Sequence, residues 1–245
     1  MIETWNGMSD EMKFYAIGLI ALCAIGIFWG ILKYKKLMKT NPALTKYERW
    51  CVRLSVFLSV LNNNLINSLA VRPYTGKNSG QLKTYWGIAN REDYEKLMSQ
   101  YKAGERCKKY DTYVGYLKQH PGVSDESIAK TEDCDAKKLA YVRETYPKLT
   151  ASSILAFDYG TYAFLTRVAY NETILTKDEA IANLREAGAL AKSKFSSWDE
   201  FIYSYYAGAV FAWADSPKSV KNYQKVMKLS LAHCKSVPFE WKDEQ

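Results

Sequence analysis

The sequence has 245 residues, of which 48% are hydrophobic and 24% are charged, and its formal net charge is +8. This composition is ordinary for a folded protein and excludes an intrinsically disordered chain. The five cysteines are odd in number and widely spaced, which argues against a disulfide framework and favours a reducing compartment. The aromatic share of 14% is high, and Tyr and Trp suit binding surfaces as well as ordinary cores.

The first predicted element is an unbroken run of 19 apolar or small residues from Phe14 to Leu32. At a rise of about 1.5 Å per residue, a helix of this length crosses a bilayer core of roughly 30 Å. A cleaved signal peptide is the alternative, but it requires a positive segment before the run and small residues at a cleavage site. Here acidic residues outnumber Lys13 before the run, and bulky residues end it. We therefore predict a single membrane-spanning helix at 14–32.

Basic residues follow this run closely and set the expected orientation. Six Lys and Arg residues lie between 33 and 49, opposed only by Glu48, whereas a single lysine precedes the run. The positive-inside tendency places such a segment on the cytoplasmic side. The same segment holds more than half of the net charge, so nucleic-acid binding is not favoured. The predicted domains are an extracytoplasmic tail at 1–13, the transmembrane helix at 14–32, a basic juxtamembrane segment at 33–49 and a helical cytoplasmic domain at 50–245.

Beyond the membrane segment the apolar residues recur at helical spacing, and no alternating strand pattern of useful length occurs. Proline and glycine residues divide the chain into segments. The stretch 106–135 is the most polar, and we expect a short helix and a surface excursion there. The predicted fold is all-α, with one N-terminal transmembrane helix and one globular domain of about six to eight helices. The other helical segments lie at 46–70, 82–103, 137–146, 151–215 and 218–235.

The stretch 151–215 is predicted to hold three consecutive helices, and two of their starts are marked by the sequence. Thr176 with Glu179, and Ser197 with Glu200, have the hydroxyl-x-x-Glu spacing of a capping box. In this motif the hydroxyl accepts from the amide three residues on, and the glutamate accepts from the amide of the capping residue. Each pair therefore predicts a helix start.

No catalytic residue, metal ligand or cofactor motif stands out, because the two histidines lack companions at metal-ligand spacing. Asp158 lies among aromatic residues, where a carboxylate is either a buried acceptor that ties two helices together or an acid with a raised pKa. Gly208 inside a helix costs about 1 kcal/mol relative to Ala, which indicates a close helix crossing or a ligand against the backbone. The candidate pocket or interface residues are Asp158, Tyr162, Trp198, Glu200, Tyr205, Gly208 and Trp213.

Three short motifs lie between Leu82 and Trp213: Tyr85-Trp86-Gly87-Ile88 followed by Arg91-Glu92, then Phe157-Asp158-Tyr159-Gly160, then Ser197-Trp198-Asp199-Glu200-Phe201. Together with Arg167, Tyr205, Gly208 and Phe211, they resemble a bacterial family known as domain of unknown function 1266, which includes uncharacterised enterobacterial proteins. The family pattern has arginine three residues after the aspartate of the second motif, and this chain has Thr161 there. The resemblance therefore implies no Asp–Arg pair in this chain. It implies a family-like core at about 82–213 and no assigned reaction.

Three functions are compatible with these observations. The leading hypothesis is a single-pass protein of the bacterial inner membrane whose cytoplasmic helical domain binds another protein. The alternative is an enzyme or small-ligand-binding domain with an acidic and aromatic pocket around Asp158 and Glu200. A toxin-immunity or secretion-associated role fits the architecture, but no residue supports it. The predicted partners are the lipid bilayer, contacted through 14–32, and a protein whose identity the sequence does not give.

Overall fold

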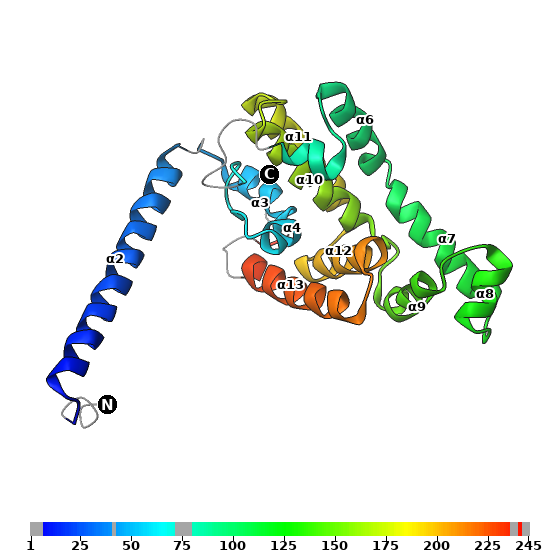
Figure 1. The fold of residues 1–245 in the computed structure, drawn as a ribbon. Helices are drawn as coiled ribbons and strands as arrows, with labels where there is room; N and C mark the ends of the chain where they lie inside the picture. Colours follow the sequence, from blue (N-terminus) through cyan, green and yellow to red (C-terminus); the bar gives the residue numbers. More distant parts are fainter. Residues whose placement is uncertain (1–6, 41–42, 72–79, 236–239, 242–245) are drawn as a thin grey trace. The chain divides into compact units, whose positions relative to one another are not determined.

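The computed structural model describes residues 7–40, 43–71, 80–235 and 240–241. The chain divides into two compact units, Met1–Ala43 and Leu44–Gln245. The first unit contains one long helix, and the second contains the other helices (Figure 1).

Helix α2 spans Asp10–Thr40. Its segment Asp10–Trp29 has a mean hydropathy of 1.9 and none of it is buried. Large apolar side chains such as Phe14 and Leu19 are 77% and 67% exposed. Among the described residues this is one helix long and apolar enough to cross a membrane, and a signal sequence near an N-terminus has the same properties. Asn41 and Pro42, where proline favours the end of a helix, lie outside the described residues.

The second unit confirms the all-α prediction, since its described residues form helices and no strand. Its described residues form eleven α-helices rather than six to eight, because several predicted segments are divided into shorter helices. They are α3 (Lys46–Arg53), α4 (Val56–Leu61), α5 (Gln81–Trp86), α6 (Arg91–Lys102), α7 (Glu105–Gln119), α8 (Asp125–Glu132), α9 (Ala136–Thr145), α10 (Leu155–Asn171), α11 (Lys177–Lys194), α12 (Trp198–Trp213) and α13 (Pro217–Lys235), with a short 3₁₀ turn, η1 (Tyr146–Lys148), after α9.

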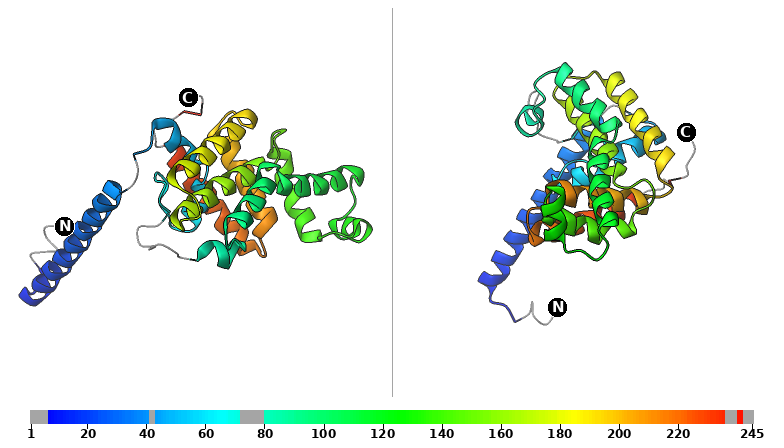
Figure 2. Two further views of the ribbon diagram at one scale, coloured as in Figure 1. Left: turned by 90° about the horizontal axis from the view of Figure 1, so that it is seen from above. Right: turned by 90° about the vertical axis from the view of Figure 1, so that its right-hand side faces the viewer.

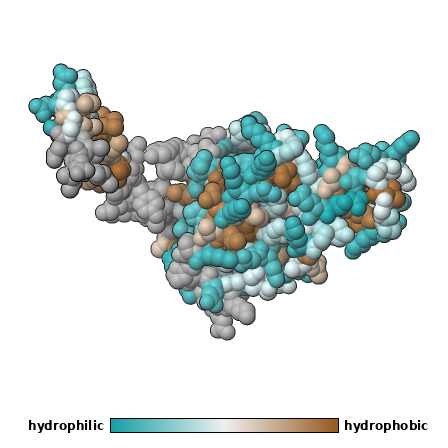
Figure 3. Space-filling model, turned by 90° about the horizontal axis from the view of Figure 1, so that it is seen from below, coloured by the Kyte–Doolittle hydropathy of each residue, from teal (hydrophilic) through white to brown (hydrophobic). Residues whose placement is uncertain are grey.

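Helix α10 lies at the centre of the second unit. It contacts α3 to α7 as well as α11 and α12, and nearly all of its residues are buried. Helix α12 packs in turn on α13, which also contacts α4. Figures 1 and 2 show α7, α8 and α9 projecting together at one end of the unit. On the face shown in Figure 3, hydrophilic residues cover most of the described surface of this unit, with small hydrophobic patches between them.

Two of the predicted helices are broken. The segment predicted as one helix at 46–70 is α3 and α4 followed by non-helical chain up to Val71. Asn63 has a positive φ of 53° there, a conformation that asparagine tolerates better than most residues and that ends a helix. The segment at 82–103 is divided at Gly87, whose φ of 69° favours glycine.

Helices α7 and α8 correct the expectation of one short helix and a surface excursion at 106–135. Helix α7 is a regular helix of 15 residues, and α8 follows it. Its sequence is polar because only Cys107, Tyr110 and Leu117 are buried, while the remaining side chains are partly or fully exposed. A helix packed along a narrow stripe at the edge of a domain carries too few apolar residues for a clear periodic pattern.

The helix starts were predicted more accurately. Thr176 and Glu179 form the complete capping box at α11. At α12 the Ser197 hydroxyl accepts from the Glu200 amide, but the Glu200 carboxylate accepts from the amide of Ser196 at 2.9 Å rather than from Ser197. A further complete capping box, in which Thr45 caps α3, was not predicted.

Helices α10 and α12 cross closely, which confirms the interpretation of Gly208 as a crossing point. A Cβ atom at Gly208 would lie 2.3 Å from Cβ of Phe157, and one at Gly160 would lie 2.5 Å from Cε2 of Tyr205. Real Cβ atoms do not approach other atoms this closely. The ring of Phe157 therefore occupies the space that a side chain at Gly208 would need.

We expect Gly208→Ala to lower the free energy of unfolding by about 1–3 kcal/mol, because overpacking at Phe157 outweighs the helix propensity that alanine adds. Gly115→Ala in α7 is the matched control, since no atom lies within 4 Å of its added Cβ. This control is expected to raise the free energy of unfolding by up to about 1 kcal/mol. Urea denaturation followed by tryptophan fluorescence measures both changes, and a stabilising Gly208→Ala would contradict the tight crossing.

Candidate functional site

Asp158 joins α10 to the beginning of α7. Its Oδ2 atom accepts a hydrogen bond from the backbone amide of Cys107 at 3.0 Å, and Oδ1 has no hydrogen-bond partner among the described residues. The residue before α7 is Gly104, which has no side chain to cap the helix, so Asp158 supplies the acceptor from another helix. Asp158 is fully buried, and this burial raises its pKa to about 7, although the Cys107 amide and the charge of Arg106 act in the opposite direction.

This geometry confirms the interpretation of Asp158 as a buried acceptor that ties two helices together. The donor is a backbone amide. The hydroxyl of Thr161 lies 2.9 Å from the hydroxyl of Tyr205. Tyr205 is fully buried between Phe57 and Phe157, with ring centroids at 4.7 and 5.5 Å. Thr161 and Tyr205 therefore act in the packing of α10 against α12.

Arg167, also on α10, is the largest fully buried charged side chain among the described residues. It is 0% exposed, and its guanidinium donates to the hydroxyls of Ser55 and Ser59 at 2.6 and 2.8 Å. It also donates to the backbone carbonyls of Leu65 and Ala70. Burial lowers the pKa of Arg167 to about 9, so the side chain is charged at pH 7. A single side chain thereby holds α4 and the non-helical chain that follows it against α10.

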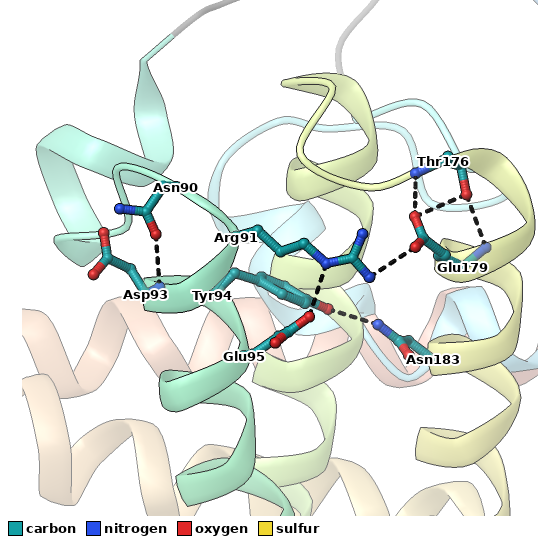
Figure 4. Close-up of polar contacts among 8 residues, drawn as sticks. All are labelled: Asn90, Arg91, Asp93, Tyr94, Glu95, Thr176, Glu179 and Asn183. Carbon is teal, nitrogen blue, oxygen red and sulfur yellow. Dashed lines mark hydrogen bonds and ion pairs between the residues drawn. The ribbon is translucent and has the colours of Figure 1, made fainter.

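A polar network joins α6 to α11 across the end of α10 (Figure 4). Arg91 forms ion pairs with Glu95 on its own helix at 2.8 Å and with Glu179 on α11 at 2.7 Å. Beneath this pair, the Tyr94 hydroxyl accepts from Asn183 at 3.1 Å. Hydrogen bonds from Thr176 and from Arg91 lower the pKa of Glu179 to about 2.

Tyr162, one of the predicted site residues, belongs to the same polar region. It is buried, and its hydroxyl donates to Glu186 at 2.7 Å, while Glu186 also pairs with Lys102 at 3.2 Å. The acidic residues of this region are therefore already paired with cations or hydroxyl groups. The network positions α6 and α11 relative to α10.

Trp198 and Glu200 lie at the start of α12. Trp198 is buried in a cluster with Trp50 and Trp241, whose ring centroids lie 5.4 and 4.8 Å from its own. Glu200 accepts from the amide and the hydroxyl of Ser196, both at 2.9 Å, and so caps the helix. The carboxylates of Glu200 and Asp158 thus serve two different helix starts, at α12 and at α7.

Trp213, at the end of α12, lines an open groove of about 380 Å³. Its ring packs edge-on against Phe157 at 4.7 Å. None of the described residues that line this groove is charged: its walls are aromatic and aliphatic, and three side-chain amides lie among them. We call it the aromatic groove, and it is lined by Leu58, Leu61, Asn62, Asn64, Gln81, Tyr85, Trp86, Phe164, Val168, Trp213 and Tyr223.

The aromatic groove contains one of the seven predicted site residues, Trp213, and several that were not predicted. Tyr85 is 76% exposed although it is a large aromatic residue, and Trp86 is partly exposed beside it. Tyr223 enters from α13. In the sequence, this groove could have been indicated by the aromatic pair Tyr85-Trp86, which lies within an otherwise polar segment that ends at Gly87. Gly208 lines a second cavity with Phe211, which is described below.

The described residues contain no group of three or more His, Cys, Asp or Glu side chains placed to hold a metal ion. The fold is that of an all-α domain preceded by an apolar helix. The chain belongs to the family described as "Protein of unknown function (DUF1266)", whose model matches residues 81–243. This match confirms the resemblance carried by the three motifs.

The chain is also similar to a curated protein of Escherichia coli. The chain is 27% identical over 146 residues to the "Uncharacterized protein YbeU" of Escherichia coli (strain K12), and the matched region covers 58% of this chain. The chain spans about 61% of the length of that relative. No solved structure matches the chain.

Proposed function

We propose that this chain is a single-pass protein of the bacterial inner membrane, anchored by 14–32, with its helical domain in the cytoplasm. Support comes from the exposed apolar surface of α2 and from the basic segment at 33–49 that follows the span. All five cysteines are free, which suits a reducing compartment. The membrane holds the domain close to partners that work at the inner surface.

We infer further that the aromatic groove binds a segment of another protein. The exposure of Tyr85 beside Trp86 and Trp213 carries this proposal, because aromatic residues are enriched where proteins bind one another. The described lining residues are uncharged, so we infer that the occupant is an uncharged segment that places an apolar side chain between the rings. The side chains of Asn62 and Gln81 offer donors and acceptors to the backbone of such a segment.

A photo-crosslinking amino acid at position 85 of the full-length protein, expressed in cells, tests this proposal. Tyr85 is exposed, so the substitution leaves the fold intact. We expect one discrete cross-linked product, identified by mass spectrometry, with the attached peptide mapped to an uncharged segment. The same amino acid at Lys130, an exposed position on α8, is the control and is expected to give no such product.

A second change shows whether the product depends on the groove. Gln81→Lys places a charge in the uncharged lining without shortening the side chain, and we expect it to reduce the cross-linked product at least tenfold. A product of equal yield from positions 85 and 130, or one that Gln81→Lys leaves unchanged, would contradict binding in the aromatic groove.

A further inference from the structure

A second cavity, of about 610 Å³, lies between α7, α9 and α12. This volume is within the range of about 300–1,000 Å³ that is typical of small-molecule sites. In contrast to the aromatic groove, three of its lining residues are cationic. We call it the cationic cavity, and it is lined by Gln100, Glu105, Arg106, Lys109, Lys138, Ile154, Phe157, Gly208, Phe211 and Ala212.

The three cations come from two helices and converge on this space. Arg106 and Lys109 are three residues apart in α7 and therefore share a face of that helix. Lys138 reaches the cavity from α9, where its Nζ atom lies 5.1 Å from the centre of the Phe211 ring. The guanidinium of Arg106 stacks over the ring of Tyr101 at 4.4 Å. These aromatic contacts hold two of the cations in place.

The cavity lining carries three cations and one carboxylate, that of Glu105. None of the three cations forms an ion pair with another described residue, and the one acidic lining residue, Glu105, pairs with Lys108 at 3.4 Å instead. The carboxyl group of Asp158 also interacts electrostatically with Arg106. It is fully buried, and this burial raises its pKa to about 7. Like charges three residues apart on a helix repel one another unless an anion lies between them.

We propose that the cationic cavity binds a small organic polyanion of the organic phosphate class. Two or three phosphate oxygens accept from Arg106, Lys109 and Lys138, since charge-assisted hydrogen bonds to guanidinium and ammonium groups are the strongest that proteins form. The cavity is several times larger than a bare phosphate group. The organic part of the ligand lies on the apolar floor beside Phe211 and Ala212. This site is separate from the aromatic groove, so it does not rest on the proposed protein partner.

Isothermal titration of the full-length protein in nanodiscs of neutral phosphatidylcholine, with pyrophosphate and with ADP as probes, tests the proposal. We expect saturable binding of at least one probe. The double variant K109E/K138E reverses two of the three charges and is expected to weaken binding at least tenfold. The control K118E/K130E changes the net charge equally at two exposed positions outside the cavity and is expected to leave the affinity within twofold.

Two further comparisons, between the two probes and between two nanodisc compositions, identify the source of the phosphate. Tighter binding of ADP than of pyrophosphate places the organic part in the cavity. A weaker apparent affinity for pyrophosphate in nanodiscs that contain phosphatidylglycerol identifies a lipid headgroup as the occupant, and an unchanged affinity identifies a soluble phosphate. The absence of saturable binding, an equal loss in both double variants, or binding of a polyglutamate peptide in place of both probes would overturn the proposal.

Discussion

Replacing Arg167 by methionine is expected to lower the free energy of unfolding by about 3–5 kcal/mol, the largest loss that we predict for a single substitution in this chain. The guanidinium is 0% exposed and donates to two hydroxyls and two carbonyls. Methionine fills similar space but donates nothing, so these four acceptors lose their partner inside the domain. An unsatisfied buried acceptor costs about 1–3 kcal/mol, and partial relaxation recovers some of the total.

Urea denaturation of the full-length protein in a mild detergent, followed by tryptophan fluorescence, measures this loss. Arg143→Met is the matched control, because the Arg143 side chain is 42% exposed and its ion pair with Asp125 lies at the surface. We expect the control to cost less than about 1 kcal/mol. Equal losses in the two variants would show that the buried contacts of Arg167 add no more stability than a surface ion pair.

Asp158→Asn is expected to make the protein more stable than the wild type at pH 8, by about 2–4 kcal/mol, and to leave the two nearly equal at pH 4. Burial raises the pKa of Asp158 from 3.8 to about 7 in the folded state. Between these values the folded state binds more protons than the unfolded state, so wild-type stability falls as the pH rises through this window. Asparagine keeps an acceptor for the Cys107 amide and does not ionise.

The free energy of unfolding of both proteins, measured at intervals from pH 4 to pH 8, isolates this contribution because all other groups are shared. Asp135→Asn makes the same chemical change at the exposed cap of α9 and is the matched control. A difference between wild type and Asp158→Asn that stays constant over this range would mean that Asp158 does not titrate within it.

The features that the sequence predicted well are those that depend on neighbouring residues. Thr176 and Glu179 are three residues apart, and their spacing alone defines the cap of α11. The three helices within 151–215 and the apolar helix α2 were predicted for the same reason, since helix propensity, capping and periodicity are local properties.

The features that the sequence did not predict depend on residues that are far apart in the chain. The hydrogen bond between Arg167 and Ser55 joins positions 112 residues apart, and nothing near either residue indicates the other. The aromatic groove likewise combines Trp86, Trp213 and Tyr223, which lie in three separate helices. The aromatic neighbours of Asp158 predicted either a buried acceptor or an acid with a raised pKa, and they did not indicate its donor. That donor, the Cys107 amide, lies 51 residues away in the chain.

Protease accessibility directly tests the proposal that α2 is a permanent anchor with the helical domain in the cytoplasm. Spheroplasts that contain the full-length protein, tagged at its C-terminus, are treated with protease before and after lysis. We expect an uncleaved protein in the membrane fraction that resists alkaline extraction, is protected in intact spheroplasts and is digested only after lysis. A shortened protein that lacks the first 32 residues and is released from the periplasm would show that the apolar helix is a cleaved signal sequence.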